Sequence, residues 1–301
     1  MRNSYKDAST INKSWALVFY SINLILWSGF GFFFQKPQKV KRDSITINND
    51  EIKIWFIGHS SFLINFFGKT ILTDPVFTKG LPFPKRNVEA GYKAHDLPHI
   101  DLLILSHAHM DHWNIQSLKL IAEKTDSVVI PKNCIDLLDS NFKNVVILDW
   151  NEKIQSGLFT IHAFKPNHWG KRFPWDNIKR QYNSYVIQRN GKSLFFCGDS
   201  GATDMFQNIG KLYEIDLAFL PIGCYLPKSF RINHLNPDDA IEAFIDIKAK
   251  CFIPMHFGSF RLSKESLDEP PRLLMKSATT SNILDVVHVL YNGESLMLSK
   301  G

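Results

Sequence analysis

Short apolar runs separated by polar turns mark the chain from residue 51 onward. Ile52, Ile54 and Phe56 alternate with Lys53 and Trp55, which predicts a strand. The runs at 62–67 and 71–73 flank Gly68-Lys69 and predict a hairpin, and the run at 102–105 is too short for a helix and predicts a buried strand. Further strands are expected at 127–130, 145–148, 158–164, 184–188, 193–197, 217–220, 251–255 and 286–290.

Two segments have the spacing of amphipathic helices. Residues 115–123 repeat apolar side chains at helical intervals, and a second helix follows Asn236, which can act as its N-cap. Pro237 suits the first helical position, and Asp238 and Asp239 favour the positive end of the helix dipole. Strands and helices are interspersed without a strict βαβ rhythm, so the pattern predicts two sheets covered by outer helices.

The first fifty residues show a different pattern. From Trp15 to Phe34 the only ionisable side chain is that of Tyr20, and twenty helical residues span about 30 Å, the thickness of a bilayer's apolar core. We therefore expect a basic N-terminus at 1–13, a transmembrane or signal-anchor helix at 14–35, a linker at 36–50 and a folded domain at 51–301. The alternative is a signal peptide cleaved near Gly29-Phe30-Gly31, which would make the protein exported.

Composition and charge narrow the class of protein. The formal charge is 35 − 29 = +6, but the first fifty residues hold seven basic and three acidic groups, so the remaining 251 residues carry only +2. This distribution argues against nucleic-acid binding, which needs a basic excess on the folded body. The four cysteines form no CxxC pair and are expected to be free thiols, which favours a cytoplasmic location for the folded domain. The oligomeric state stays open.

One segment concentrates groups that bind metals. Three histidines and an aspartate follow the predicted strand at 102–105, in the order His107, His109, Asp111 and His112. Imidazole and carboxylate are ligands that Zn²⁺ accepts. Seven residues cannot enclose two metals, so distant ligands are expected; His168, Asp199 and His256 each follow a predicted strand. Together these side chains suit two zinc ions, and iron or manganese would also fit.

The H-x-H-x-D-H pattern at 107–112 resembles the signature of the metallo-β-lactamase superfamily. Within it, segments 58–61, 72–77, 220–240 and 256–271 resemble N-acylphosphatidylethanolamine-hydrolysing phospholipase D and its bacterial relatives, and the likeness extends over residues 52–275. The resemblance implies a four-layer αββα sandwich with both metals at one edge. One zinc would be bound by His107, His109 and His168, the other by Asp111, His112 and His256, with Asp199 bridging them. Met110 departs from that branch, which often has an aromatic residue there.

The resemblance also implies supporting roles around the metals. Asp74 is expected to orient the ligand loop, the alternative being an ordinary turn aspartate before Pro75, and His59 is expected either to orient a ligand or to be a satisfied core histidine. His234 is expected near the substrate headgroup, where it is a candidate general acid. A lipid-facing lip is predicted after His168, although its aromatic rings could equally fold back onto the domain. Its residues are Trp169, Lys171, Arg172, Phe173 and Trp175.

These expectations combine into a phospholipase D-type phosphodiesterase. A hydroxide shared by two zinc ions is nucleophilic near neutral pH, and Asp111 can orient it as well as bind metal. The bond cut would lie between phosphorus and the headgroup alcohol, giving phosphatidic acid and an N-acylethanolamine. The alternatives are a lactonase or other carboxyl-ester hydrolase on the same site, and a catalytically silent, membrane-bound binding protein.

Overall fold

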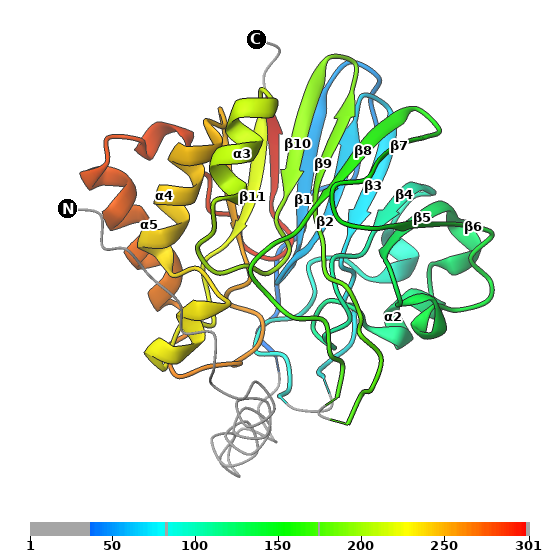
Figure 1. The fold of residues 1–301 in the computed structure, drawn as a ribbon, viewed down its shortest axis with the longest axis horizontal. Coiled ribbons are helices and arrows are strands. Elements are labelled where there is room, and N and C mark those ends of the chain that lie inside the picture. Colours follow the sequence, from blue (N-terminus) through cyan, green and yellow to red (C-terminus); the bar gives the residue numbers. More distant parts are fainter. Residues whose placement is uncertain (1–36, 82–83, 174, 299–301) are drawn as a thin grey trace.

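Two mixed β-sheets form the centre of the molecule (Figure 1). The computed structural model describes residues 37–81, 84–173 and 175–298. The seven-stranded sheet has the order β13-β1-β2-β3-β4-β5-β6. Its strands are β1 (Ile52–Gly58), β2 (Ser61–Phe66), β3 (Lys69–Thr73), β4 (Ile100–Ile104), β5 (Thr125–Pro131), β6 (Asn144–Leu148) and β13 (Ser295–Leu298).

The second sheet has six strands in the order β12-β11-β10-β9-β8-β7. Its strands are β7 (Lys153–Ser156), β8 (Phe159–Phe164), β9 (Ser184–Arg189), β10 (Lys192–Phe196), β11 (Leu217–Pro221) and β12 (Phe252–Met255). Strands β10, β11 and β12 are parallel, whereas β7 to β10 pair antiparallel. The other sheet is likewise antiparallel from β13 to β3 and parallel from β3 to β6.

Helices flank the two sheets on opposite sides. Figure 1 shows α3 (Met205–Leu212), α4 (Pro237–Ile247) and α5 (Glu269–Thr280) on one side, and the short α2 (Ile115–Lys119) on the other. The largest apolar cluster contains side chains of both sheets together with α3, α4 and α5. A second cluster joins the seven-stranded sheet to α2 through Trp55, Trp113 and their neighbours. Each sheet therefore buries apolar side chains on both faces.

The strand directions bring several loops to one edge. The pairing makes β1, β3 and β4 run in the same direction, and the same holds for β8, β10, β11 and β12. Loops that follow equivalent strand ends meet at the same edge of a sheet. At this edge the backbone nitrogen of His256, after β12, donates to the carbonyl of His59, after β1, at 2.9 Å. The two sheets are thus joined at the edge where the metal-ligand candidates lie.

Several predicted elements differ from the structure. The predicted strand at 286–290 is wrong: only Val287 forms a bridge, to Phe252, because this stretch follows the turn η6 (Leu284–Val286). The outer strand of the other sheet is instead β13, which has weaker alternation. The predicted helix at 115–123 ends at Lys119 and gives way to the 3-10 turn η3 (Ala122–Lys124), because β5 begins at Thr125. Helix α4 is as predicted, with the Asn236 side chain accepting from the Asp239 backbone at 2.8 Å.

The expected anchor at 14–35 and the basic N-terminus at 1–13 lie outside the described residues. Of the helices in the part of the chain that the structure describes, none combines the length and the apolar character needed to cross a bilayer. The expected linker is largely irregular from residue 37 to residue 50. Gln38 pairs with Val88 in this stretch, so the linker is attached to the folded body.

Candidate metal centre

The H-x-H-x-D-H segment forms a tight loop directly after β4. Within it, the backbone nitrogens of His112 and Trp113 both donate to the carbonyl of His109, at 3.1 and 2.7 Å. Asn114 then caps α2 by accepting from the Ser117 backbone at 2.9 Å. The turn and the cap fix where the loop ends and α2 begins. The candidate ligands therefore lie on a turn and not on a helix, and their side chains converge.

A first group of imidazoles gathers around His109. Its Nδ1 lies 2.9 Å from Nε2 of His107 and 3.2 Å from Nε2 of His168, which reaches across from the loop after β8. One ligand atom from each of these three histidines and from Asp199 fits within a span of 4.8 Å. His107 and His168 are buried, whereas His109 is half-buried and marks the solvent side of the group.

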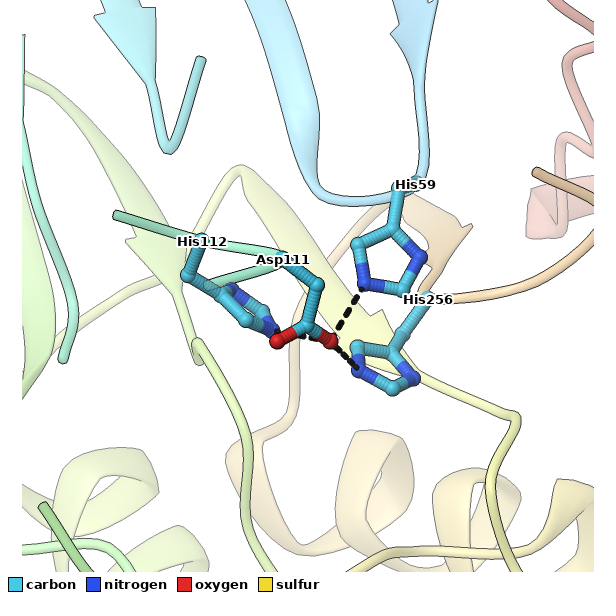
Figure 2. A group of neighbouring side chains, drawn as sticks. All are labelled: His59, Asp111, His112 and His256. Carbon is cyan, nitrogen blue, oxygen red and sulfur yellow. Dashed lines mark hydrogen bonds and ion pairs between the residues drawn. The ribbon is translucent and has the colours of Figure 1, made fainter. Parts of the chain in front are cut away.

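A second group surrounds the carboxylate of Asp111, as Figure 2 shows. Its Oδ2 lies 3.0 Å from Nε2 of His59, 3.4 Å from Nε2 of His256 and 3.7 Å from Nε2 of His112. These four residues also place one ligand atom each within 4.8 Å of the others. His59, for which the sequence did not predict metal binding, therefore lies close enough to be a ligand candidate itself.

Asp199 lies between the two groups. Its Oδ2 is 3.1 Å from His256 Nε2 and 3.3 Å from His112 Nε2, both of the second group. The same oxygen is 3.8 Å from His168 Nε2 and 3.9 Å from His107 Nε2, both of the first group. All seven residues predicted as ligands are thus brought together, and a single carboxylate faces both groups. This is the arrangement expected of a dinuclear site with a shared ligand.

Asp74 fixes the ligand loop from behind. Its carboxylate accepts from the Ser106 backbone nitrogen at 2.8 Å and hydroxyl at 2.5 Å, and it lies 2.7 Å from Nδ1 of His112. The Ser106 hydroxyl in turn lies 2.9 Å from Nδ1 of His107. These contacts leave the Nε2 atoms of both histidines facing the cluster. Carboxylate contacts to the second ring nitrogen are typical of metal-binding histidines.

His234 borders the cluster from the segment before α4. Its Nδ1 is 3.7 Å from Oδ2 of Asp199, and its ring lies 5.1 Å from that of His168. The segment is held because the Leu235 nitrogen donates to the Ser200 carbonyl at 2.8 Å. Gly201 is needed at this contact, since a Cβ there would lie 2.1 Å from the Ile232 carbonyl oxygen. His234 therefore lies beside the candidate ligands and is itself buried.

Three loop residues of the site adopt left-handed backbone conformations. His59 has φ 62°, Asp74 has φ 31° and His256 has φ 63°, although none is glycine. Such conformations cost about 1–3 kcal/mol each and persist when the surroundings enforce them. Close packing does so here: a Cβ on Gly223 would lie 2.1 Å from the His256 carbonyl oxygen. The strain lies at the residues that aim side chains into the cluster.

Burial and charge set the protonation of the cluster. Burial lowers the pKa of His107 and His168 well below the usual range and that of His109 to about 4, so all three are neutral at pH 7. Burial is the largest single influence on His112 and His256 and opposes their protonation, but the charges and hydrogen bonds of the surrounding aspartates, Asp199 foremost, together outweigh it. The pKa of His112 is raised well above its usual range, and that of His256 to about 9. Cations bound here would therefore displace protons from these two rings.

The pattern of unpaired atoms fits a metal centre. Among the described residues, His112 Nε2, His256 Nε2 and Asp199 Oδ1 are buried and form no hydrogen bond, although both nitrogens lie within ion-pair distance of Asp199 Oδ2, at 3.3 and 3.1 Å. Buried polar atoms are almost always satisfied, so a cluster of orphaned ligand atoms is unusual. Metal ions would satisfy all three. The donor set of imidazoles and carboxylates suits zinc, iron or manganese, and it does not distinguish among them.

The residues of the predicted lip do not form one surface in the structure: some contact the candidate site and others are exposed. Trp169 packs against the site, with its ring 4.4 Å from that of His168 and 5.0 Å from that of His109. The Arg172 guanidinium points inward to two backbone carbonyls. Lys171 and Trp175 are exposed, and Trp175 stacks on Phe173 at 5.1 Å. The inward contact of Arg172 had no signal in the sequence, because no local pattern reveals which way a loop arginine turns.

Fold and site together define a metal-dependent hydrolase of the metallo-β-lactamase fold. The family model described as the beta-lactamase superfamily domain matches residues 69–257, and the chain belongs to that superfamily. A bacterial relative, a UPF0173 metal-dependent hydrolase of Ligilactobacillus salivarius, is 29% identical over 72% of this chain and 90% of its own length.

Two curated relatives carry a more specific name. N-acyl-phosphatidylethanolamine-hydrolyzing phospholipase D 1 of Caenorhabditis elegans is 29% identical over 73% of this chain and 68% of its own length. The mitochondrial enzyme of the same description from Saccharomyces cerevisiae is 30% identical over 73% of this chain, but the match spans only 50% of the yeast protein.

The fold is also seen in a solved structure. Igni18, a metallo hydrolase of Ignicoccus hospitalis, superposes with a TM-score of 0.66 over 83% of this chain and all of its own chain. Its sequence identity is 20%, so this likeness concerns the fold alone.

Proposed function

We propose that the protein is a zinc-dependent phosphodiesterase of phospholipase D type, acting on N-acylphosphatidylethanolamine-like lipids. The observation that carries the proposal is Asp199, whose Oδ2 lies within 3.9 Å of imidazoles from both groups. A pair of cations held this way supplies an activated water nucleophile and positive charge for a phosphoryl oxygen. The names of the worm and yeast relatives support the choice of lipid.

We assign the other roles in the reaction to Asp111 and His234. Asp111 faces solvent more than Asp199 does, with 12% of its side chain exposed against 1%, so it is the carboxylate that can orient an incoming water. His234 stands on the other side of Asp199. Burial lowers the pKa of His234 to about 4, so its ring is neutral at pH 7. We therefore assign His234 to hydrogen bonding with a substrate oxygen, because as a general acid it would be mostly deprotonated.

We propose that the apolar run at 15–34 attaches the chain to the membrane. Gln38 exchanges backbone hydrogen bonds with Asn87 and Glu89, at 2.8 and 3.0 Å. The Asn87 nitrogen donates to Ser259, three residues after His256. Gln38 follows Phe34 by four positions, and these four steps of the chain can span about 14 Å at most. An anchor ending at Phe34 would therefore hold the metal-centre edge close to the lipid surface.

The exposed part of the loop after His168 would then meet the bilayer. Trp175 is 74% exposed and Lys171 is exposed in the same loop, a combination that favours the headgroup zone. We expect an environment-sensitive dye on Trp175→Cys to shift to shorter wavelength with anionic vesicles, and a dye on Leu212→Cys not to shift. The four native cysteines are buried, so labelling is selective. Equal shifts at both positions would contradict this orientation.

The decisive test of the function uses the full chain loaded with zinc. Phosphorus NMR of vesicles that contain N-acylphosphatidylethanolamine should show the diester signal replaced by that of phosphatidic acid. A lactone panel and a carboxyl-ester panel run in parallel test the rival hydrolase on the same site. Lactone or ester turnover without any change in the phosphorus spectrum would overturn the lipid assignment.

A further inference from the structure

A single arginine contacts both sides of the ligand loop. Nη1 of Arg172 donates to the carbonyl of Ala108 at 2.7 Å and to the carbonyl of Trp113 at 2.9 Å. Ala108 precedes His109 by one residue, and Trp113 follows His112 by one residue. Both carbonyls belong to residues with no exposed surface. One guanidinium nitrogen thus draws together the two ends of the stretch that carries the candidate ligands 109, 111 and 112.

The arginine itself is held by its own loop. Asp176 Oδ2 lies 3.3 Å from the Arg172 backbone nitrogen, from which it accepts, and accepts from Arg180 Nε at 2.7 Å. Arg180 also makes a bidentate pair with Asp136, at 2.6 and 2.8 Å. The same loop carries His168 four residues before Arg172. The guanidinium therefore links the loop after β8 to the loop after β4, and each loop carries ligand candidates of the first group.

We propose that Arg172 is a positioning residue that sets the metal affinity of the site by closing the 108–113 loop, and that it is not part of a lipid-binding lip. The front of the loop is already fixed by Asp74 and Ser106, but Arg172 is the charged side chain observed to hold its far end. This proposal rests on the proposed metal site and not on the choice of lipid substrate.

Removal of the guanidinium leaves two buried carbonyls without these donors, and the loop then gains freedom to move its ligands. Mutation of an outer-sphere partner of a metal ligand typically costs about 10–100-fold in metal affinity. We expect Arg172→Met to fall in this range for at least one zinc ion. Arg172→Lys should lose less, because an ammonium donates but reaches less far and lacks the planar guanidinium geometry.

The test measures zinc affinity of the full chain by competition with a chromophoric chelator. It also records the visible absorption of the Co²⁺-loaded protein, which reports ligand geometry at saturating metal and is not altered by a purely structural role. Lys179→Met is the matched control, since Lys179 is exposed in the same loop. The expected result is weaker zinc binding and an altered cobalt spectrum for Arg172→Met, intermediate values for Arg172→Lys, and no change in the control.

Wild-type zinc affinity and cobalt spectra in the arginine variants would overturn the proposal. If Arg172→Met does not fold, Arg172→Lys alone decides in the same way. Loss of anionic-vesicle binding with unchanged metal affinity would also overturn it and return Arg172 to the lip. A wild-type protein that binds zinc but cleaves no lipid would refute the proposed function while leaving this inference intact.

Discussion

Carboxylates at the two ends of the β-sheets have different kinds of partners. Near the start of β4, Asp101 accepts from the Thr70 backbone at 2.8 Å and from Lys69 Nζ at 2.6 Å. Just before β11, Asp216 accepts from the Ser193 backbone at 3.0 Å and pairs with two lysines at 3.0 Å. At the other end of the sheets, Asp199 faces several imidazoles and keeps a buried oxygen without a hydrogen bond.

This contrast distinguishes aspartates that stabilise the fold from aspartates that belong to the candidate metal site. At the far end, lysines and backbone nitrogens donate hydrogen bonds to the carboxylates, so the protein alone satisfies these acceptors. At the site end, the partners are imidazoles that are themselves candidate metal ligands, and several of their nitrogens form no hydrogen bond. Both ends carry an aspartate next to a buried strand, so the residue type alone does not identify the site. The chemical nature of the partners does.

An aspartate-to-asparagine substitution at each end of the sheets is expected to give the largest difference in hydrolysis and zinc content. Asp199→Asn removes the charge that faces both imidazole groups, so two cations would lose their shared anionic ligand. We expect hydrolysis to fall at least about a thousandfold, which corresponds to about 4 kcal/mol of transition-state stabilisation. The zinc content of the purified variant should fall below that of the wild type, as measured by elemental analysis.

Asp216→Asn is the matched control for that experiment. It removes a carboxylate of equal charge at the far end, where the partners are lysines and a backbone nitrogen. We expect lower thermal stability with unchanged zinc content and hydrolysis. If Asp199→Asn keeps full activity, or if both variants lose activity equally, the division between the two ends is wrong.

Metal removal should destabilise the protein by an intermediate amount. A ligand present at about a thousand times its Kd stabilises the folded state by about 4 kcal/mol, and in a chain of this size that shifts Tm by roughly 10 °C. We expect a strong chelator to lower Tm by about that amount and added zinc to restore it, as followed by circular dichroism. An unchanged Tm would mean that the unsatisfied atoms of the site do not bind metal.

The sequence was sufficient to predict most strands because short apolar runs and polar turns are local signals. It failed at 286–290, where an apolar run lies beside β12 with one bridge, and at β13, where the partner strand determines the pairing. The extent of α2 was also overestimated, since the start of β5 sets where that helix must end. In these cases, the structural context and not the local pattern determined which element formed.

The candidate ligands were found for a different reason. His107, Asp111 and their neighbours form a compact motif, and the distant ligands each follow an apolar strand, so topology predicts their convergence. The inward turn of Arg172 and the proximity of His59 to Asp111 depend on side-chain directions across loops, which spacing along the chain does not encode. The N-terminal apolar run is clear in sequence, but the expected anchor stays a prediction.

The smallest expected effect concerns the far end alone. Burial opposes the charge of Asp101, but its contacts with Lys69 and Thr70 lower its pKa below the usual value. Because the folded-state pKa is depressed, its stabilisation is present above the unfolded pKa of about 3.9 and is lost as pH falls through the folded pKa. Asp101→Asn should lower the free energy of unfolding by about 1–3 kcal/mol at pH 7. In urea titrations this difference should shrink below about pH 4, while zinc content at pH 7 stays unchanged; a change in zinc content would show that the two ends are coupled.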